Sequence, residues 1–212
     1  MKRLILYASL FFPVFASAQY GIKAGVNFAN VTNASSINSE SQSGFMIGGF
    51  LAPVSKSILS YRSEIIYSKQ GYDFKTNTNT GSVSLDYILL PQLMCINITK
   101  LFQLQAGFQM AFLINAEADS TTSQGTTMPY GEIMDYYNKF DYGFAAGAEV
   151  HPFKGLLVGA RWNISLANMY EDAQTGQQPS FRVEDAKNNV IQIFAGWQFG
   201  GKAAASGGTS SY

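Results

Sequence analysis

Charged residues are scarce in this sequence. They make up 13% of its 212 residues, against about 25% in a typical soluble domain. The formal net charge is zero, which gives no reason to expect nucleic acid as a partner. The sequence also lacks any run of about eighteen apolar residues, so no transmembrane helix is expected.

Cysteine and histidine occur once each, as Cys95 and His151. A lone cysteine cannot form an internal disulfide, and Cys95 is expected to pack as a small apolar side chain. Catalysis of acyl transfer or proteolysis would need a serine or carboxylate beside His151. No such partner is obvious from the sequence, although residues that are close in space cannot be identified this way. We therefore predict no enzymatic activity, no cofactor and no metal site.

What the sequence does contain is alternation, most clearly over 102–114 (FQLQAGFQMAFLI). One parity is wholly apolar and includes Phe108 and Phe112, whereas the other begins with Gln103 and Gln105. A period of two indicates a β-strand. The segment is long enough to cross a bilayer at a tilt, which takes roughly 9–11 residues. It is predicted to face lipid on one side and a narrow polar lumen on the other.

Similar alternation recurs along the chain, and mean hydropathy is only +0.01 because apolar and polar faces cancel. The sequence predicts an all-β fold, an eight-stranded antiparallel up-and-down transmembrane β-barrel. The fourth strand is ambiguous, since Ile88 and Leu90 share a face with Asp86, and Pro91 removes one backbone donor. The predicted strands are 20–30, 44–52, 58–71, 83–96, 102–114, 135–150, 156–166 and 189–199.

The connections alternate in length. Segments 31–43, 73–82, 118–134 and 170–187 are polar and predicted to be long loops, and the connections between them are short. Outer-membrane barrels combine short periplasmic turns with longer extracellular loops. We therefore expect location in the outer membrane of a Gram-negative bacterium, with both barrel termini on the periplasmic side.

The N-terminal segment has the order of a secretory signal peptide. Lys2 and Arg3 precede an apolar run over 4–15, and Ala16-Ser17-Ala18 supplies small residues for cleavage before Gln19. The run contains a proline and is too short for a membrane helix. The predicted organisation is a signal peptide over 1–18, the barrel over 19–199 and a flexible Gly/Ser/Ala-rich tail over 200–212.

Four segments, taken in order, resemble the PorT-like outer-membrane β-barrel family. They are YGIKAGVNFANV at Tyr20–Val31, SEIIYSKQGYDF at Ser63–Phe74, LDYILLPQLM at Leu85–Met94 and the closing NVIQIFAGWQF. The chain has Leu89 where that family often has a glutamate, and it continues past the terminal aromatic Phe199. The resemblance implies a small outer-membrane barrel without assigned chemistry. The family's namesake is associated with secretion across the outer membrane, a role that the fold alone does not transfer.

Charged residues on the predicted inner faces are expected to pair, because side chains fill a small barrel and an unpaired buried charge is costly. A salt-bridge network that fixes the strand register is favoured over a proton or ion path. The predicted lumen charges are Lys23, Arg62, Glu64, Asp86, Lys139, Asp141, Glu149 and Arg161.

The favoured function is a non-enzymatic structural element or docking scaffold that acts through its extracellular loops, with a possible link to secretion or envelope assembly. Met128, Tyr130 and Ile133 are the apolar loop residues that a partner is predicted to bury. The expected partners are outer-membrane lipid, the barrel-assembly machinery through the C-terminal strand, and an unknown protein or surface ligand. An outer-membrane enzyme, a narrow pore and a secreted lipocalin-like barrel remain as alternatives.

Overall fold

A computed structural model describes residues 18–32, 40–53, 57–75, 79–122, 127–170 and 186–199. No helix within these ranges is long and apolar enough to cross a membrane. The described ranges contain one 3-10 helix, η1, which spans Met134–Tyr136. The strands are β1 (Ala18–Thr32), β2 (Glu40–Pro53), β3 (Leu59–Lys75), β4 (Asn79–Asn97), β5 (Phe102–Thr122), β6 (Thr127–Glu132), β7 (Phe140–Phe153), β8 (Leu156–Ser165) and β9 (Lys187–Phe199).

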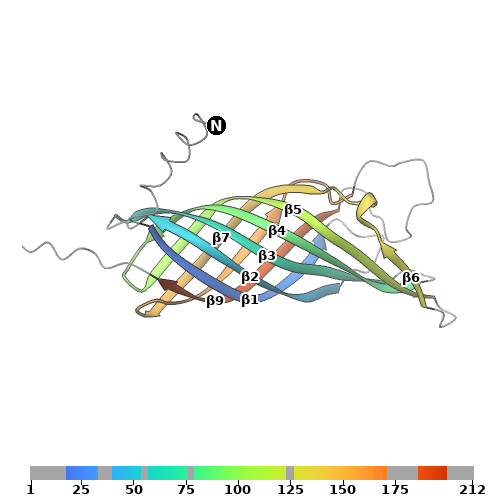
Figure 1. The fold of residues 1–212 in the computed structure, drawn as a ribbon, viewed down its shortest axis with the longest axis horizontal. Helices are drawn as coiled ribbons and strands as arrows, with labels where there is room; N and C mark the ends of the chain where they lie inside the picture. Colours follow the sequence, from blue (N-terminus) through green and yellow to red (C-terminus); the bar gives the residue numbers. More distant parts are fainter. Residues whose placement is uncertain are drawn as a thin grey trace, which may run out of the picture.

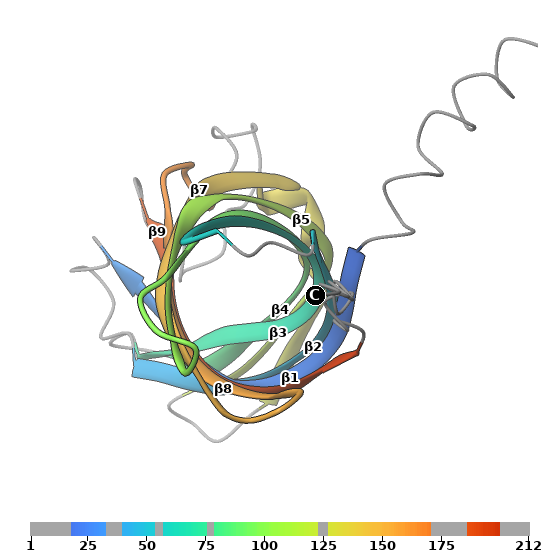
Figure 2. The same ribbon diagram turned by 90° about the vertical axis from the view of Figure 1, so that its left-hand side faces the viewer.

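Eight of the strands close into an antiparallel barrel, which confirms the predicted fold. The sheet runs in the order β4-β3-β2-β1-β9-β8-β7-β5, and pairing of β4 with β5 completes the ring. The closed ring is visible when the molecule is viewed along its long axis (Figure 2). β6 pairs only with β5 and takes no part in closure.

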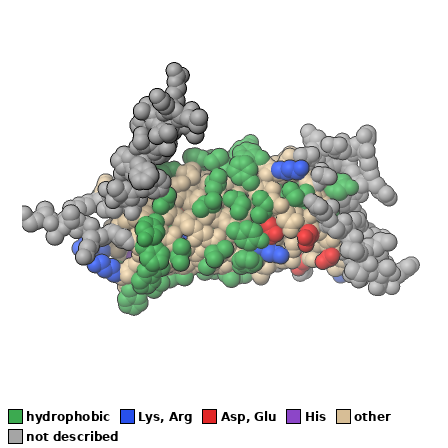
Figure 3. Space-filling model, viewed as in Figure 1, with side chains coloured by type: hydrophobic (Ala, Val, Ile, Leu, Met, Phe, Trp, Pro, Cys, Tyr) green, Lys and Arg blue, Asp and Glu red, His purple; other side chains and the backbone are tan. Residues whose placement is uncertain are grey.

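The outward faces carry an apolar belt around the middle of the barrel (Figure 3). Phe108 and Phe112 are 53% and 41% exposed, so the predicted orientation of this central strand is confirmed. Aromatic side chains pair across neighbouring strands, with ring centroids 5.3 Å apart for Phe112 and Phe140. A soluble lipocalin-like barrel would turn these rings inward, and the structure rules out that arrangement.

The two ends of the barrel differ (Figure 1). At the turn end, β1 begins, β9 finishes and short connections join β4 to β5 and β7 to β8. The second of these turns contains Gly155, whose φ of 94° favours glycine because it lacks a Cβ. At the opposite hairpin end, β4 and β5 continue past the beginning of β7 and are joined by β6.

The structure resolves the ambiguous faces of β4. Leu85, Leu89 and Leu93 point inward and are almost fully buried, so Asp86 lies on the opposite, outer face. The pairing of β3 with β4 skips two positions, Glu64 opposite Pro91 and Ile65 opposite Leu90, without a change of register. The missing proline donor is thus absorbed by a local gap in the ladder. The register shift between β4 and β5 lies elsewhere, at Asp86 and Tyr87, where Ile114 of β5 is the unpaired extra residue.

Two of the predicted long loops are wrong. Most of 73–82 is strand, because β3 runs to Lys75 and β4 begins at Asn79. Segment 118–134 is largely the end of β5 followed by β6. Polar residues can form strands wherever backbone pairing continues and the outer face meets water, so their composition was a poor guide. For 31–43 and 170–187, the stretches 33–39 and 171–185 lie outside the described residues.

Candidate functional site

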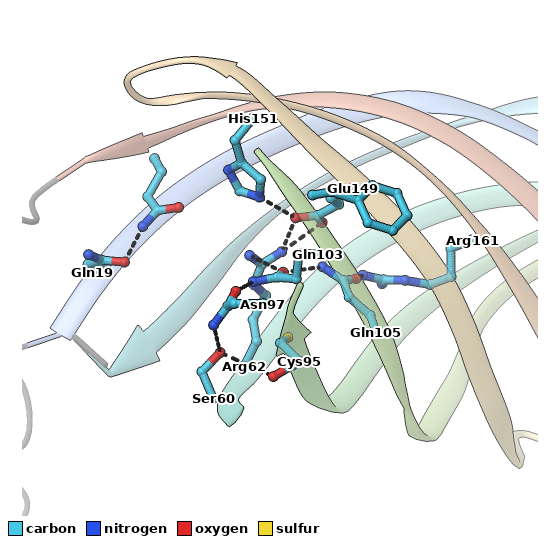
Figure 4. A network of polar contacts seen from close by, with 12 residues as sticks. Gln19, Ser60, Arg62, Cys95, Asn97, Gln103, Gln105, Glu149, His151 and Arg161 are labelled. Carbon is cyan, nitrogen blue, oxygen red and sulfur yellow. Dashed lines mark hydrogen bonds and ion pairs between the residues drawn. The ribbon is translucent and has the colours of Figure 1, made fainter. Parts of the chain in front are cut away.

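A charged cluster fills the half of the lumen nearest the turn end (Figure 4). Glu64 accepts from Arg161, with 2.6 Å between Oε2 and Nη1, and lies 2.6 Å from Lys23 Nζ. Arg62 Nη1 donates to both carboxylate oxygens of Glu149, at 2.7 and 2.8 Å. All of these side chains are buried, so the predicted internal salt-bridge network is observed for these residues. We call them the charge cluster.

Amide side chains connect the charge cluster. Arg62 Nη2 donates to Gln103 Oε1 at 3.1 Å, and Arg161 Nη2 donates to Gln105 Oε1 at 2.8 Å. Gln105 in turn donates to Gln103. The glutamines of β5 therefore serve as hydrogen-bond partners for buried guanidinium groups, which would otherwise carry unsatisfied donors. This explains the alternating glutamines that make the strand conspicuous in the sequence.

Aromatic rings pack over the cations. Lys23 Nζ lies 4.3 Å from the centroid of Phe194, and the Arg62 guanidinium lies 4.6 Å from that of Phe50. Such contacts add attraction for desolvated cations.

The half of the lumen toward the hairpin end contains a large apolar cluster, which differs from the narrow polar lumen that we predicted. Residues from several strands form one buried cluster there, including Ile66, Phe74, Leu85 and Leu113. Because a barrel of eight strands has room only for side chains, its interior packs like a core. Leu89, which departs from the PorT-like pattern, belongs to this cluster and fits its apolar surroundings.

Residues that follow β6 close the hairpin end of the lumen. Tyr137 is fully buried and its hydroxyl lies 2.8 Å from that of Tyr72 and 3.4 Å from that of Tyr170. Burial raises the pKa of Tyr137 well above its ordinary value of 10.0, so the phenol stays neutral. Ile133 is only 2% exposed and packs in the same cluster. Its predicted role as an exposed contact for a partner is therefore wrong.

The remaining predicted lumen charges do not join the charge cluster. Asp86 faces outward and accepts from Asn115 at 3.3 Å. Lys139 is exposed at the beginning of β7. Asp141 does face the lumen, but it accepts a hydrogen bond from Ser165 at 2.6 Å, away from the cluster. The side chains of Met128 and Tyr130 lie outside the described residues, so their predicted contact role stays a prediction.

His151 has a carboxylate neighbour that the sequence analysis did not identify. Its Nε2 lies 3.5 Å from Glu149 Oε2, because residues two apart on a strand share a face. Within the described part of the chain, no hydrogen bond joins the His151 imidazole to a serine hydroxyl or to the Cys95 thiol. The described residues likewise include no group of three or more His, Cys, Asp or Glu side chains placed to hold a metal ion.

Open space inside the barrel is concentrated at the turn end. A cavity of about 430 Å³ opens there beside Arg62, Cys95 and His151. In mid-lumen, a gap beside Gln109, Asp141 and Asn163 measures about 10 Å³, close to the space for one water molecule. The lumen is thus an open vestibule at the turn end followed by a packed core.

Comparison with known proteins agrees with this architecture. The model of the family described as "Outer membrane protein beta-barrel domain" matches residues 12–171. Among curated proteins, no sequence match was found. Several solved outer-membrane proteins are similar to this chain at low sequence identity.

One is Ail, the attachment invasion locus protein of Yersinia pestis, which is 13% identical, with 86% of this chain and 99% of that chain covered and a TM-score of 0.48. Neisserial surface protein A is 12% identical, with coverage of 85% and 97% and a TM-score of 0.48. OprG from Pseudomonas aeruginosa is 10% identical, with coverage of 87% and 97% and a TM-score of 0.41. A closed eight-stranded barrel, a lipid-facing apolar belt and a family match over most of the sequence lead to one conclusion: this chain belongs to the outer-membrane-protein β-barrel family and resides in the outer membrane.

Proposed function

We propose that the protein is a non-enzymatic docking scaffold that binds a macromolecule at its hairpin end. The observation that carries this proposal is a sheet that projects beyond the start of β7, formed by 79–86 of β4, 115–122 of β5 and β6. We call it the hairpin sheet, and Figure 1 shows it at the right-hand end of the molecule. Since β6 does not help to close the barrel, the β6 part of the hairpin sheet is ordered structure without a role in closure.

The orientation of the barrel supports an external role for this sheet. Outer-membrane barrels keep their short turns on the periplasmic side and longer segments outside. With that orientation, the hairpin sheet projects from the cell surface. Binding residues commonly lie on segments that a rigid framework presents to solvent.

A photo-crosslinking experiment tests this proposal. Tyr136 in η1 is 39% exposed at the hairpin end, so a photoreactive phenylalanine derivative there samples the surface beside the hairpin sheet. We expect ultraviolet illumination of intact cells to link this position to another macromolecule. The same derivative at Phe108, which faces lipid, should give no such adduct.

The matched control shortens the hairpin by removing 121–130 and joining the strands with a two-residue turn. Barrel closure does not use this segment, so the variant should still show a heat-modifiable shift on gels while the Tyr136 adduct disappears. An adduct that persists without the hairpin, or one that forms equally at Phe108, would refute docking at this sheet.

A conducting pore is not supported by the packing of the lumen. The mid-lumen gap of about 10 Å³ is far too small for a hydrated ion, and the charge cluster closes the path toward the turn end. We therefore expect negligible conductance when the purified protein is inserted into planar bilayers. Large and steady single-channel currents would contradict the static packing and favour the pore alternative.

The identity of the docked partner is a narrower proposal. The PorT-like resemblance of Ser63–Phe74 and Leu85–Met94 favours a component of secretion or envelope assembly. Enzymatic activity is the weaker alternative, because the Glu149–His151 pair has no recorded nucleophile beside it within the described residues and Glu149 is engaged by Arg62.

A further inference from the structure

The turn end contains a vestibule formed by two adjoining cavities of about 430 and 400 Å³. Both are lined by Gln19, Lys100, His151 and Gln198, so they share a wall. The deeper cavity reaches Arg62 of the charge cluster, and the outer one extends to Lys154. The vestibule therefore connects bulk solvent with the buried charges.

The lining of this vestibule is one-sided in charge. Arg62, Lys100, Lys154 and His151 supply basic groups, and none of the described residues that line either cavity is acidic. Lys100 and Lys154 are exposed, and no ion pair joins either of them to a carboxylate within the described residues. In the view of Figure 3, the turn end shows basic but no acidic side chains, whereas acidic and further basic side chains lie toward the hairpin end. A concave surface lined by charges of one sign raises the local concentration of ions of the opposite sign.

The charge cluster behind the vestibule adds to this positive potential. Among the described residues, the ion-pair partners of Lys23, Arg62 and Arg161 are Glu64 and Glu149, so the cluster has one more basic side chain than it has carboxylates. A buried excess charge is costly unless a counter-charge approaches it. The open side of the cluster is the side of the vestibule, since Arg62 lines the cavity.

The vestibule wall at the charge cluster also contains a hydrogen-bond donor without a partner. Arg62 is 2% exposed, and its Nε has no hydrogen-bond partner, whereas Nη1 and Nη2 are engaged by Glu149 and Gln103. In Figure 4, one nitrogen of the His151 imidazole faces Glu149 and the other points away from it. Guanidinium, ammonium and imidazole groups are the donors that proteins use for phosphate-type oxyanions.

We propose that this vestibule binds a phosphate-type oxyanion, either free or presented by the headgroup of an anionic phospholipid. The rest of the lining is rich in amide and hydroxyl side chains, including Asn97, Thr99 and Gln103. That chemistry suits a hydrated, polar ligand and disfavours an apolar one. The site is distinct from the hairpin sheet, because it lies at the opposite end of the barrel.

The single histidine provides a direct assay. His151 is the only histidine in the chain, so a histidine-labelled sample gives one set of imidazole signals in an NMR spectrum. We expect inorganic phosphate, titrated into the protein in neutral detergent at constant pH and ionic strength, to shift these signals saturably. Sodium chloride at the same ionic strength should not reproduce the shift.

Lysine variants distinguish phosphate binding in the vestibule from a general effect of the protein's surface charge. Lys100→Gln removes a charge from the shared wall of the vestibule and should weaken phosphate binding by about fivefold, the effect of one surface lysine on an anion. Lys75→Gln removes an exposed lysine at the hairpin end and should leave the affinity unchanged. Both positions are exposed, so neither change should disturb folding.

A second arm identifies the source of the anion. The same signals are compared in nanodiscs of phosphatidylcholine alone and with added phosphatidylglycerol. A shift with free phosphate supports a soluble ligand, and a shift only with phosphatidylglycerol supports a lipid headgroup. If neither probe shifts the His151 signals, or if Lys75→Gln weakens binding as much as Lys100→Gln does, the proposed site is wrong.

Discussion

Glu64→Gln is expected to lower the free energy of unfolding by about 3–5 kcal/mol, the usual cost of removing one partner from a buried ion pair. Glu64 is the carboxylate shared by Lys23 and Arg161, and it is 3% exposed. Its neutralisation leaves three buried cations facing the single carboxylate of Glu149. The effect can be measured by urea unfolding in lipid vesicles, with fluorescence of the lipid-facing Trp162 and Trp197 as the probe.

Glu117→Gln is the matched control for this experiment. Glu117 lies on the exposed face of β5 at the hairpin end, where it accepts one long hydrogen bond from Asn115. An exposed substitution of this kind should change stability by no more than about 0.5 kcal/mol. Equal effects of the two changes would mean that the charge cluster contributes nothing specific to the fold.

The strands that span the barrel could be predicted because their two faces meet different solvents. Phe108 and Phe112 face lipid, whereas Gln103 and Gln105 face the lumen. Apolar and polar residues therefore alternate along this strand in the sequence. Its period of two fixes both the strand and its orientation. The same logic placed Lys23, Arg62, Glu64, Glu149 and Arg161 inside the barrel.

Alternation failed where both faces of a strand are apolar. On β4, Leu85, Leu89 and Leu93 pack in the lumen while Ile88 and Leu90 lie on the outer face with Asp86. Hydrophobicity alone cannot distinguish a lipid-facing leucine from one in a packed interior. The apolar half of the lumen was therefore missed, and the side of Asp86 was assigned wrongly.

Contacts between strands that are distant in sequence were beyond the reach of the sequence analysis. Arg62 and Glu149 belong to β3 and β7, which are not neighbours in the sheet, and they meet only across the lumen. The register of the closed ring decides such pairs. For the same reason the vestibule, which combines residues of several turns, had no signature in any single segment. The Glu149–His151 contact is different, because a spacing of two along one strand places both side chains on the same face, a signal that the sequence analysis did not use.

Phe108→Arg is expected to destabilise the barrel by about 2–4 kcal/mol, the cost of a charge on the lipid face near the bilayer midplane. Phe108 is 53% exposed on the outer face and is paired with Phe144 on β7. Phe108→Leu serves as the packing control, because it keeps an apolar side chain in lipid and should cost far less. Both variants can be measured by the same unfolding assay in lipid vesicles.

Gln109→Arg tests the opposite face of the same strand. Gln109 lines the mid-lumen gap together with Asp141, and its Oε1 is buried without a hydrogen-bond partner. An arginine there gains a carboxylate within the same gap and removes an unsatisfied acceptor, so it should cost less than Phe108→Arg despite its larger volume. If both arginines cost the same, the difference between the lipid face and the lumen face does not control stability. A greater cost for Gln109→Arg would mean that the packing of the lumen outweighs the penalty of placing a charge in lipid.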